Sequence, residues 1–290
     1  MSASIRQSVL YAQNFLKDPR LIALLLDRSH MEHKDVVYEI GPGKGVITEQ
    51  LARRYQQVFA IEKDPRLADL LREQFSGWPN VTIYAGDFLS YPLPCQRYKV
   101  FANIPFNITS AIVTRLTTAA HPPEDAHLIM QKEAAEMFLG EPRASLRSLL
   151  LKPWFSLEIT HRFQRRDFTP APRVDVVMLR LRKRGPPLVK AGDCQPFRDF
   201  VVHLFTNWQP SSPHALNSVF TRPQRTYIQR TLGLDLDSPP VSLPIEQWLI
   251  LFGYFQTIAT DQARQKIVGS EQRLIQQQKN LQKIHRTRVT

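Results

Sequence analysis

The stretch Val36-Val37-Tyr38-Glu39-Ile40-Gly41-Pro42-Gly43-Lys44-Gly45 decides the fold of this chain. The first five residues favour a buried strand, and the glycines that follow favour a tight turn that opens a helix. Because glycine has no Cβ, such a turn lets a ligand approach the backbone closely. The spacing is G-x-G-x-G, not the G-x-G-x-x-G of dinucleotide folds. Taken by itself, the motif fits an ordinary tight turn as well as a nucleotide site.

Apolar strand-like runs recur along the first two thirds of the chain, with helix-like segments between them. Strands that are apolar throughout and spaced by helices predict a mostly parallel sheet covered on both faces. The predicted strands are residues 36–40, 58–62, 81–84, 99–103 and 126–131, and the predicted helices are 46–55, 66–75, 109–119 and 133–139. Two longer runs, 148–163 and 174–182, alternate in character and predict a hairpin that closes the sheet.

Gly185-Pro186-Pro187 interrupts this pattern and predicts a domain boundary. We predict an α/β catalytic domain with a Rossmann-like sheet over residues 1–187 and a small C-terminal helical domain over 188–258. Residues 259–290 are rich in Gln and Lys and poor in apolar residues. This composition predicts a basic tail that is either a helix of low stability or disordered.

The net charge of +12 is concentrated in two segments. Residues 160–184 hold eight Lys or Arg against two Asp, and residues 259–290 hold seven against two acidic residues. Clustered positive charge favours a nucleic-acid partner, and the alternative is a set of solvated faces with a disordered tail. Apolar runs stay short of the roughly 18 residues of a membrane span, and residues 1–7 lack the apolar core of a secretory signal. We therefore expect a cytoplasmic protein without a membrane partner.

Side chains with metal-ligating chemistry are scattered. Cys95 and Cys194 stand far apart, and the eight histidines show no ligand spacing, so we predict neither a disulfide nor a metal site. Asp125, Glu133 and Glu136 are expected to be charges on helix surfaces.

Acidic residues end the two strands predicted after the glycine turn. Glu62 lies 21 residues after Gly41, where a carboxylate can accept hydrogen bonds from both ribose hydroxyls of a nucleoside. Asp87 is placed to accept from an adenine amino group, with Phe88 packing near the ring. A surface carboxylate and a simple turn are the alternatives. Because these residues and the Gly41 and Gly43 turn arrive at the carboxyl ends of successive strands, together they predict an adenosine-type cofactor.

The tetrapeptide Asn103-Ile104-Pro105-Phe106 follows the next strand. The N6 amine of adenine is a poor nucleophile because its lone pair is delocalised into the ring. The Asn103 side-chain oxygen and the Ile104 carbonyl, accepting from the two N–H bonds, would localise that lone pair, with Pro105 restricting the backbone. Phe106 would stack on the extruded base. With the cofactor site, this predicts methyl transfer from S-adenosylmethionine (SAM) to a nucleobase amine, although a strand end followed by a turn has the same pattern.

A second aromatic residue, Phe168, precedes Thr169-Pro170-Ala171-Pro172. A loop stiffened by prolines can hold this ring against the other face of the base, and the alternative is a ring packed on the hairpin. Four arginines flank this loop and are predicted to bind RNA phosphates: Arg162, Arg165, Arg166 and Arg173.

The motifs quoted above, with Gln13-Asn14-Phe15-Leu16 before them, occur in the order seen in ribosomal RNA adenine N6-methyltransferases, which this chain resembles over residues 11–184. Asn107-Ile108-Thr109 after the tetrapeptide and Lys152-Pro153-Trp154-Phe155 are similar to the erythromycin-resistance branch. Val176 departs from many members, which have Ser there.

The resemblance implies a SAM-dependent methyltransferase sheet, SAM contacts at Asn14, Leu16, Gly41, Glu62, Asp87 and Asn103, and target-base contacts at Asn103, Phe106 and Phe168. The implied activity is mono- or dimethylation of one adenine N6 in 23S (large-subunit) ribosomal RNA, which confers macrolide, lincosamide and streptogramin B resistance. We expect a monomer that acts on naked rRNA or a precursor large subunit.

Two other interpretations remain open. The first is a housekeeping 16S (small-subunit) rRNA adenine dimethyltransferase. The second is a catalytically inactive nucleic-acid-binding protein on the same scaffold.

Overall fold

The computed structural model describes residues 14–207, 214–233 and 239–287. The chain divides into two compact units. The first comprises Met1–Glu136 and Phe155–Arg184, and the second comprises Met137–Trp154 and Gly185–Thr290. Within the described residues, no helix combines the length and apolar character needed to cross a membrane.

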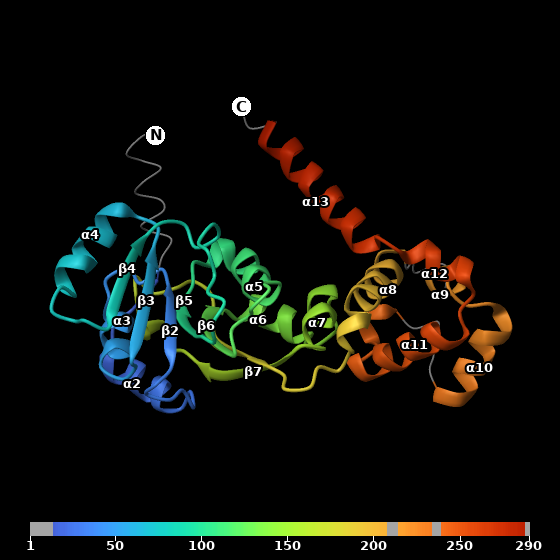
Figure 1. Ribbon diagram of the computed structural model, residues 1–290, viewed down its shortest axis with the longest axis horizontal. Coiled ribbons are helices and arrows are strands. Elements are labelled where there is room, and N and C mark those ends of the chain that lie inside the picture. The colour runs from blue at the N-terminus through green and yellow to red at the C-terminus, as the bar shows by residue number, and fades with distance from the viewer. Residues whose placement is uncertain (1–13, 208–213, 234–238, 288–290) are drawn as a thin grey trace. The chain divides into compact units, whose positions relative to one another are not determined.

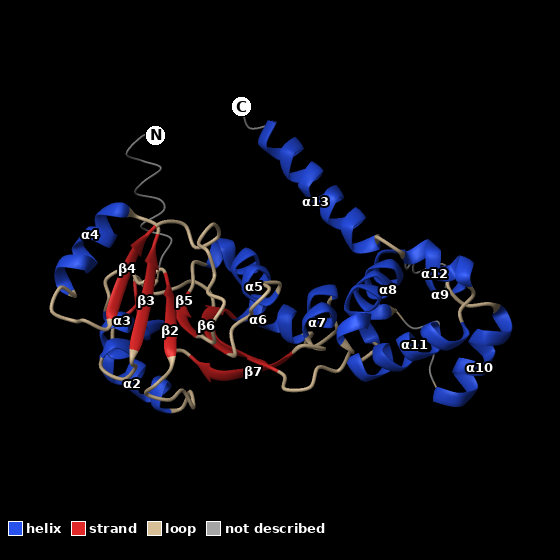
Figure 2. Ribbon diagram, in the orientation of Figure 1, coloured by secondary structure: helices blue, strands red, loops and turns tan. Residues whose placement is uncertain are grey.

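Seven of the described strands form one sheet in the first unit, in the order β4-β3-β2-β5-β6-β9-β7 (Figures 1 and 2). Neighbouring strands from β4 to β6 run parallel, whereas β9 is antiparallel to both β6 and β7. This arrangement confirms the predicted Rossmann-like sheet and its closing hairpin. The strands are β2 Val36–Ile40, β3 Gln57–Glu62, β4 Val81–Ala85, β5 Lys99–Asn103, β6 Asp125–Gln131, β7 Phe155–Arg162 and β9 Val176–Lys183.

Helices connect the consecutive parallel strands, except β4 and β5, which residues 86–98 join without a helix. The ends of these helices follow local chemistry. Asp64 accepts a hydrogen bond from the Arg66 amide, and Pro65 occupies the first turn, so α4 begins there. A further helix, α2, was not predicted from the sequence; Asp18 caps it and its apolar face is buried. The helices of this unit are α2 Pro19–Asp27, α3 Val46–Ala52, α4 Pro65–Gln74 and α5 Thr109–Thr117, and α6 Lys132–Leu139 begins in this unit and ends in the second.

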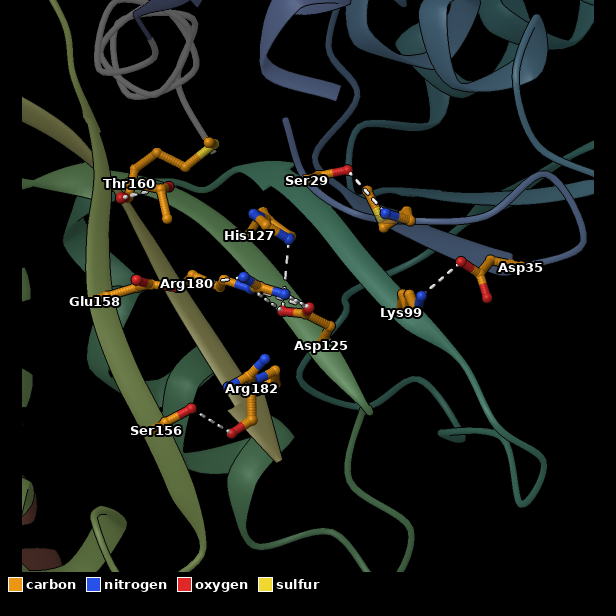
Figure 3. A network of polar contacts seen from close by, with 12 residues as sticks. Ser29, Asp35, Lys99, Asp125, His127, Ser156, Glu158, Thr160, Arg180 and Arg182 are labelled. Atoms are coloured by element: carbon orange, nitrogen blue, oxygen red, sulfur yellow. Dashed lines mark hydrogen bonds and ion pairs between the residues drawn. The ribbon is translucent and has the colours of Figure 1, made fainter. Parts of the chain in front are cut away.

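A network of ion pairs joins the antiparallel strands to the parallel part of the sheet (Figure 3). The Arg180 guanidinium on β9 donates to both oxygens of Asp125 on β6, at 2.6 and 3.1 Å, and to Glu158 on β7 at 3.2 Å. The expectation that Asp125 is a surface charge is wrong, because the carboxylate is buried at the start of a central strand. Burial is tolerated because the guanidinium pairs with it in a forked geometry.

A small second sheet joins two segments far apart in the sequence. β1, Phe15–Leu16, pairs antiparallel with β8, Phe168–Thr169, so that Leu16 lies opposite Phe168. Both side chains are buried in one core cluster with Ile22 and Met178. This pairing holds the segment before the first helix beside the loop after β7.

The second unit is helical and has its own core, in which Phe197, Phe200, Trp248 and Phe252 are fully or almost fully buried. This confirms the predicted helical C-terminal domain. Its helices are α7 Leu146–Leu151, α8 Cys194–Asn207, α9 His214–Asn217, α10 Arg222–Leu232, α11 Ile245–Ile258, α12 Asp261–Ile267 and α13 Ser270–Thr287.

The structure differs from the predicted boundaries at two places. Residues 148–151 form the end of α7 and not a strand, because Ser145 accepts from the Ser148 amide and caps the helix. Leu149 packs in the core of the helical unit, so residues 137–154 belong to that unit and not to residues 1–187. The predicted tail is helical in α12 and α13, and residues 288–290 lie outside the described part.

Candidate active site

The predicted site residues follow the carboxyl ends of four neighbouring strands. In the order β4-β3-β2-β5 these ends carry Asp87, Glu62, the glycine loop and Asn103. Parallel strands present their carboxyl ends at one edge of the sheet, so these segments line that edge in succession. The glycine loop lies centrally among them, after β2.

The glycine loop has a backbone that other residues adopt only with strain. Gly41, Gly43 and Gly45 have positive φ angles of 68°, 58° and 78°. A Cβ on Gly43 would lie 2.4 Å from the Phe15 ring, so this position has no room for a side chain. The loop therefore requires glycine for its conformation and, at Gly43, for its packing against Phe15.

The carboxylate of Glu62 lies directly against this loop. Its Oε2 accepts from the Gly43 amide at 3.1 Å, and its Oε1 accepts from the Asp64 amide at 2.9 Å. Only 3% of Glu62 is exposed. Each carboxylate oxygen has a further lone pair, so Glu62 retains capacity to accept from the hydroxyls of a ribose.

A second buried carboxylate, Glu39, which was not among the predicted site residues, lies at the end of β2 just before the loop. It is 1% exposed, and Thr48 donates to its Oε2 at 2.6 Å. Burial raises the pKa of Glu39 to about 8, with the nearby Glu62 charge acting in the same direction. Glu39 is therefore largely protonated near neutral pH.

Asp87 is held in place at the end of β4. Its carboxylate accepts from the Lys63 ammonium at 2.7 Å and from the Leu89 amide at 2.9 Å. The hydrogen bond from Lys63 is the largest cause that lowers the pKa of Asp87, so this group stays ionised. Phe88 is buried beside it. Lys63 was not among the predicted site residues, although it directly follows Glu62 at the end of a predicted strand.

A pocket surrounds the tetrapeptide after β5. It is lined by Asn14, Phe15, Gly41 and the four residues Asn103, Ile104, Pro105 and Phe106. The Asn103 amide nitrogen donates to the Asn14 carbonyl at 2.6 Å, and the Ile104 amide donates to Ile129 at 3.2 Å. The first bond fixes the orientation of the Asn103 amide and leaves its oxygen, Oδ1, to accept from a ligand.

The two predicted aromatic residues differ in their exposure. Phe106 is half-buried and lines the pocket. Phe168 is only 2% exposed, lies in the core with its ring 5.3 Å from Phe163, and is not part of the pocket lining. In this conformation Phe168 packs on the hairpin, which was the alternative interpretation, and its contact with a target base stays a prediction.

The four predicted RNA-binding arginines are all exposed. Arg162 ends β7, Arg165 and Arg166 form a short 3-10 turn, and Arg173 lies between β8 and β9. Arg165 lies 3.7 Å from Asp175, but both side chains are more than half exposed. Such a pair is weak in water, so the arginine remains accessible to a phosphate.

The order of the first five strands, with a glycine loop at the switch point and acidic residues on the next two strands, defines a Rossmann-like methyltransferase. A family model described as ribosomal RNA adenine dimethylase matches residues 5–257. The chain belongs to this family, which confirms the predicted resemblance.

Three relatives illustrate the range of the family. An rRNA adenine N-6-methyltransferase of Saccharopolyspora erythraea is 34% identical over 250 residues, which are 83% of this chain and 64% of that protein. A probable ribosomal RNA small subunit methyltransferase A of Thermococcus onnurineus is 37% identical over 70% of this chain and 73% of its own length. The crystal structure of the 23S rRNA methyltransferase ErmE matches with a TM-score of 0.77 and 33% identity, over 84% of this chain and all of that one.

Proposed function

We propose that this protein transfers methyl groups from SAM to N6 of a specific adenine in 23S rRNA and thereby confers macrolide, lincosamide and streptogramin B resistance. The observation that carries the proposal is the orientation of Asn103, whose amide nitrogen is bonded to the Asn14 carbonyl. Its Oδ1 is then an acceptor at the pocket between the glycine loop and Phe106. An exocyclic amine, which has two N–H donors, matches this acceptor.

The residues at the strand ends fit an adenosine-type cofactor. The glycine loop, which positive φ angles and the packing of Phe15 against Gly43 hold in one conformation, lies at the centre of these strand ends. Glu62 would accept from the ribose hydroxyls, and Asp87 from the adenine amine. Asn14, Leu16, Gly41, Phe88 and Asn103 complete the proposed cofactor contacts. When bound, SAM supplies a methyl group already activated by its sulfonium.

The protein's part in the chemistry is alignment and polarisation of the amine. Asn103 Oδ1 and the Ile104 carbonyl accept from the two N–H bonds and draw the nitrogen lone pair out of the ring. Phe106 stacks on the base, a contact worth about 1–3 kcal/mol. The base must leave its stack to reach the pocket, which costs a few kcal/mol. The proton of the methylated amine leaves to water, so no covalent enzyme intermediate is needed.

The proposed target RNA is inferred from exposed arginines of this chain and from the name of a solved relative. Exposed Arg162, Arg165, Arg166 and Arg173 would grip phosphates beside the site. The name of the solved relative ErmE supports 23S rRNA as the substrate. We propose a cytoplasmic monomer that acts on naked rRNA or a precursor particle, because the mature subunit buries the site. Methyl groups on N6 remove hydrogen-bonding capacity and fill the space against which the drugs pack.

The housekeeping 16S dimethyltransferase is the second candidate, and the Thermococcus relative favours it. Primer extension on rRNA from a host that expresses this protein separates the two, because the stop falls in 23S or in 16S rRNA. Mass spectrometry of the isolated nucleoside then distinguishes one methyl from two.

Drug susceptibility of the same host gives the second readout. The proposal expects resistance with the native protein and sensitivity with Asn103→Ala. Methylation confined to 16S rRNA would support the second candidate. Methylation of neither RNA by a protein that still binds RNA would support the inactive binding protein.

A further inference from the structure

The C-terminal helices α12 and α13 lie beyond the family match, which ends at residue 257. The family resemblance therefore assigns them no role. α13 spans Ser270–Thr287 and is the longest helix in the described part of the chain. An appended element of this length has to be explained from its own contacts and charges.

Two adjacent residues of α8 hold the first turn of α13. The Asp199 carboxylate accepts from the amides of Gly269 and Glu271 at 3.0 and 2.9 Å and so caps the helix. The Arg198 guanidinium donates from Nε to both Glu271 oxygens, at 2.8 and 2.9 Å. Asp199 is buried, and Ile267, just before α13, lies in the core of the unit. The helix is therefore anchored at its N-terminal end.

After this anchor, the described side chains from Ile275 to Asn280 are exposed. Gln276, Gln277, Gln278 and Asn280 are exposed, and Ile275 is 44% exposed. A helical segment with so little packing is marginal in water, since most helical stability in proteins comes from tertiary contacts. The exposed segment gains little from the unit that carries it.

All charged residues from Arg273 onward are basic. Glu271 is the last acidic residue in the sequence, and Arg198 neutralises it. Five basic residues follow it: Arg273, Lys279, Lys283, Arg286 and Arg288. Positions 279, 283 and 286 follow the i, i+4, i+7 spacing that places residues on one face of a helix. At about 1.5 Å per residue they span roughly 10 Å, a length suited to neighbouring phosphates of one nucleic-acid strand.

We propose that α13 is an RNA-backbone arm, anchored by Arg198 and Asp199, whose basic residues at positions 279, 283 and 286 of the helical register contact phosphates of the substrate rRNA. This inference rests on the proposed function only in taking rRNA as the substrate. The arm increases affinity without selecting the adenine, because phosphate contacts carry no sequence information. Polyanion binding also relieves repulsion between its like charges, so the helix becomes more stable on RNA.

The test is the salt dependence of RNA binding by the full-length protein. Fragments of 23S and 16S rRNA are titrated at several KCl concentrations, with the native protein and with the triple variant Lys279→Gln/Lys283→Gln/Arg286→Gln. Each lost phosphate contact removes about 0.7–0.9 from the slope of log K against log salt, so the triple variant should lose about 2–3. Its turnover at saturating RNA should stay native, because phosphate contacts set the affinity for RNA and the substitutions leave the candidate site of the first unit unchanged.

A matched control removes three cations that pair with acidic neighbours in the first unit: Lys34→Gln, Arg53→Gln and Arg72→Gln. This control should keep the native slope. A slope that falls equally in both variants, or in neither, overturns the proposal. A second outcome also overturns the proposal. If the native protein binds anionic vesicles, and the triple variant loses this binding but keeps the RNA slope, the partner is a membrane surface.

Glu271→Gln separates an anchored arm from a loose basic tail. The substitution raises the net charge by one, so charge alone predicts tighter RNA binding. An anchored arm predicts weaker binding, by about threefold or more, because the bond from Arg198 is lost. Tighter binding would show that the anchor is irrelevant. Because both rRNAs serve as binding probes, an error in the proposed methylation target leaves these outcomes unchanged.

Discussion

The amide nitrogen of Asn103 donates a 2.6 Å hydrogen bond to the backbone carbonyl of Asn14. The two residues are 89 positions apart in the sequence, and the bond joins the end of β5 to the segment that enters β1. β1 in turn pairs with β8, the strand that carries Phe168. The orientation of the proposed acceptor is therefore held by a segment that also contacts the loop predicted to bind the target base.

Asn103→Ala removes the proposed acceptor and should lower kcat about 100-fold or more, as the loss of a preorganised polar group in other active sites does. SAM affinity should fall much less, because the glycine loop, Glu62 and Asp87 remain. Single-turnover methylation and calorimetric SAM titration measure the two effects. Asn80→Ala is the control, since Asn80 bonds to the Ala52 and Tyr55 carbonyls and has only a structural role. An equal loss of turnover in both variants would contradict the role of Asn103.

Gly43→Ala tests whether the glycine loop must stay free of side chains. The positive φ angle costs a non-glycine residue about 1–2 kcal/mol, and the new Cβ would collide with the Phe15 ring. We expect a lower melting temperature and SAM binding weakened by about tenfold or more. Gly77→Ala is matched to it, because Gly77 is exposed and a Cβ there meets no atom within 4 Å. Native SAM affinity in Gly43→Ala would show that cofactor binding does not depend on the conformation of this loop.

The sheet and the strand-end residues could be predicted because their signals are local. Each parallel strand is a short apolar run, and strand 36–40 has the same ends in the sequence analysis and in the structure. Residues at the ends of such strands are placed by topology alone, which is why Glu62, Asp87 and Asn103 lie along one edge. The class of site therefore follows from short-range patterns.

Contacts between distant segments could not be predicted in the same way. The leucine run 149–151 is compatible with a strand or a helix. It is helical because Ser145 caps the helix and Leu149 packs in the core of the helical unit. The burial of Phe168 depends on its pairing opposite Leu16. The local sequence of neither segment predicts this long-range register. The raised pKa of Glu39 likewise depends on burial that arises only in the folded sheet.

Phe106→Ala should reduce methylation while SAM binding stays near native. Loss of stacking worth about 1–3 kcal/mol corresponds to a decrease of about 5- to 150-fold in kcat/KM for RNA. Phe106→Tyr keeps an aromatic face and should retain most of the activity. Because Phe106 also packs against the core of the first unit, thermal unfolding of both variants should be recorded with the kinetics. Equal losses of SAM affinity and turnover would contradict a stacking role.

Glu39→Gln should change how stability depends on pH. Burial raises the pKa of Glu39 from 4.5 to about 8, so the folded protein holds a proton that the unfolded chain releases between these values. The native protein should therefore lose stability as pH rises from about 5 to 8, with this group contributing about 1.4 kcal/mol per pH unit at most. Gln cannot ionise and can still accept from Thr48, so the variant should lose this slope and be the more stable protein at pH 8. Urea unfolding at several pH values measures both, with Glu49→Gln, an exposed residue of α3 paired with Arg53, as the control. If Glu39→Gln and the native protein unfold with the same pH profile, Glu39 is ionised in the folded state, and its assignment as a protonated group near neutral pH is wrong.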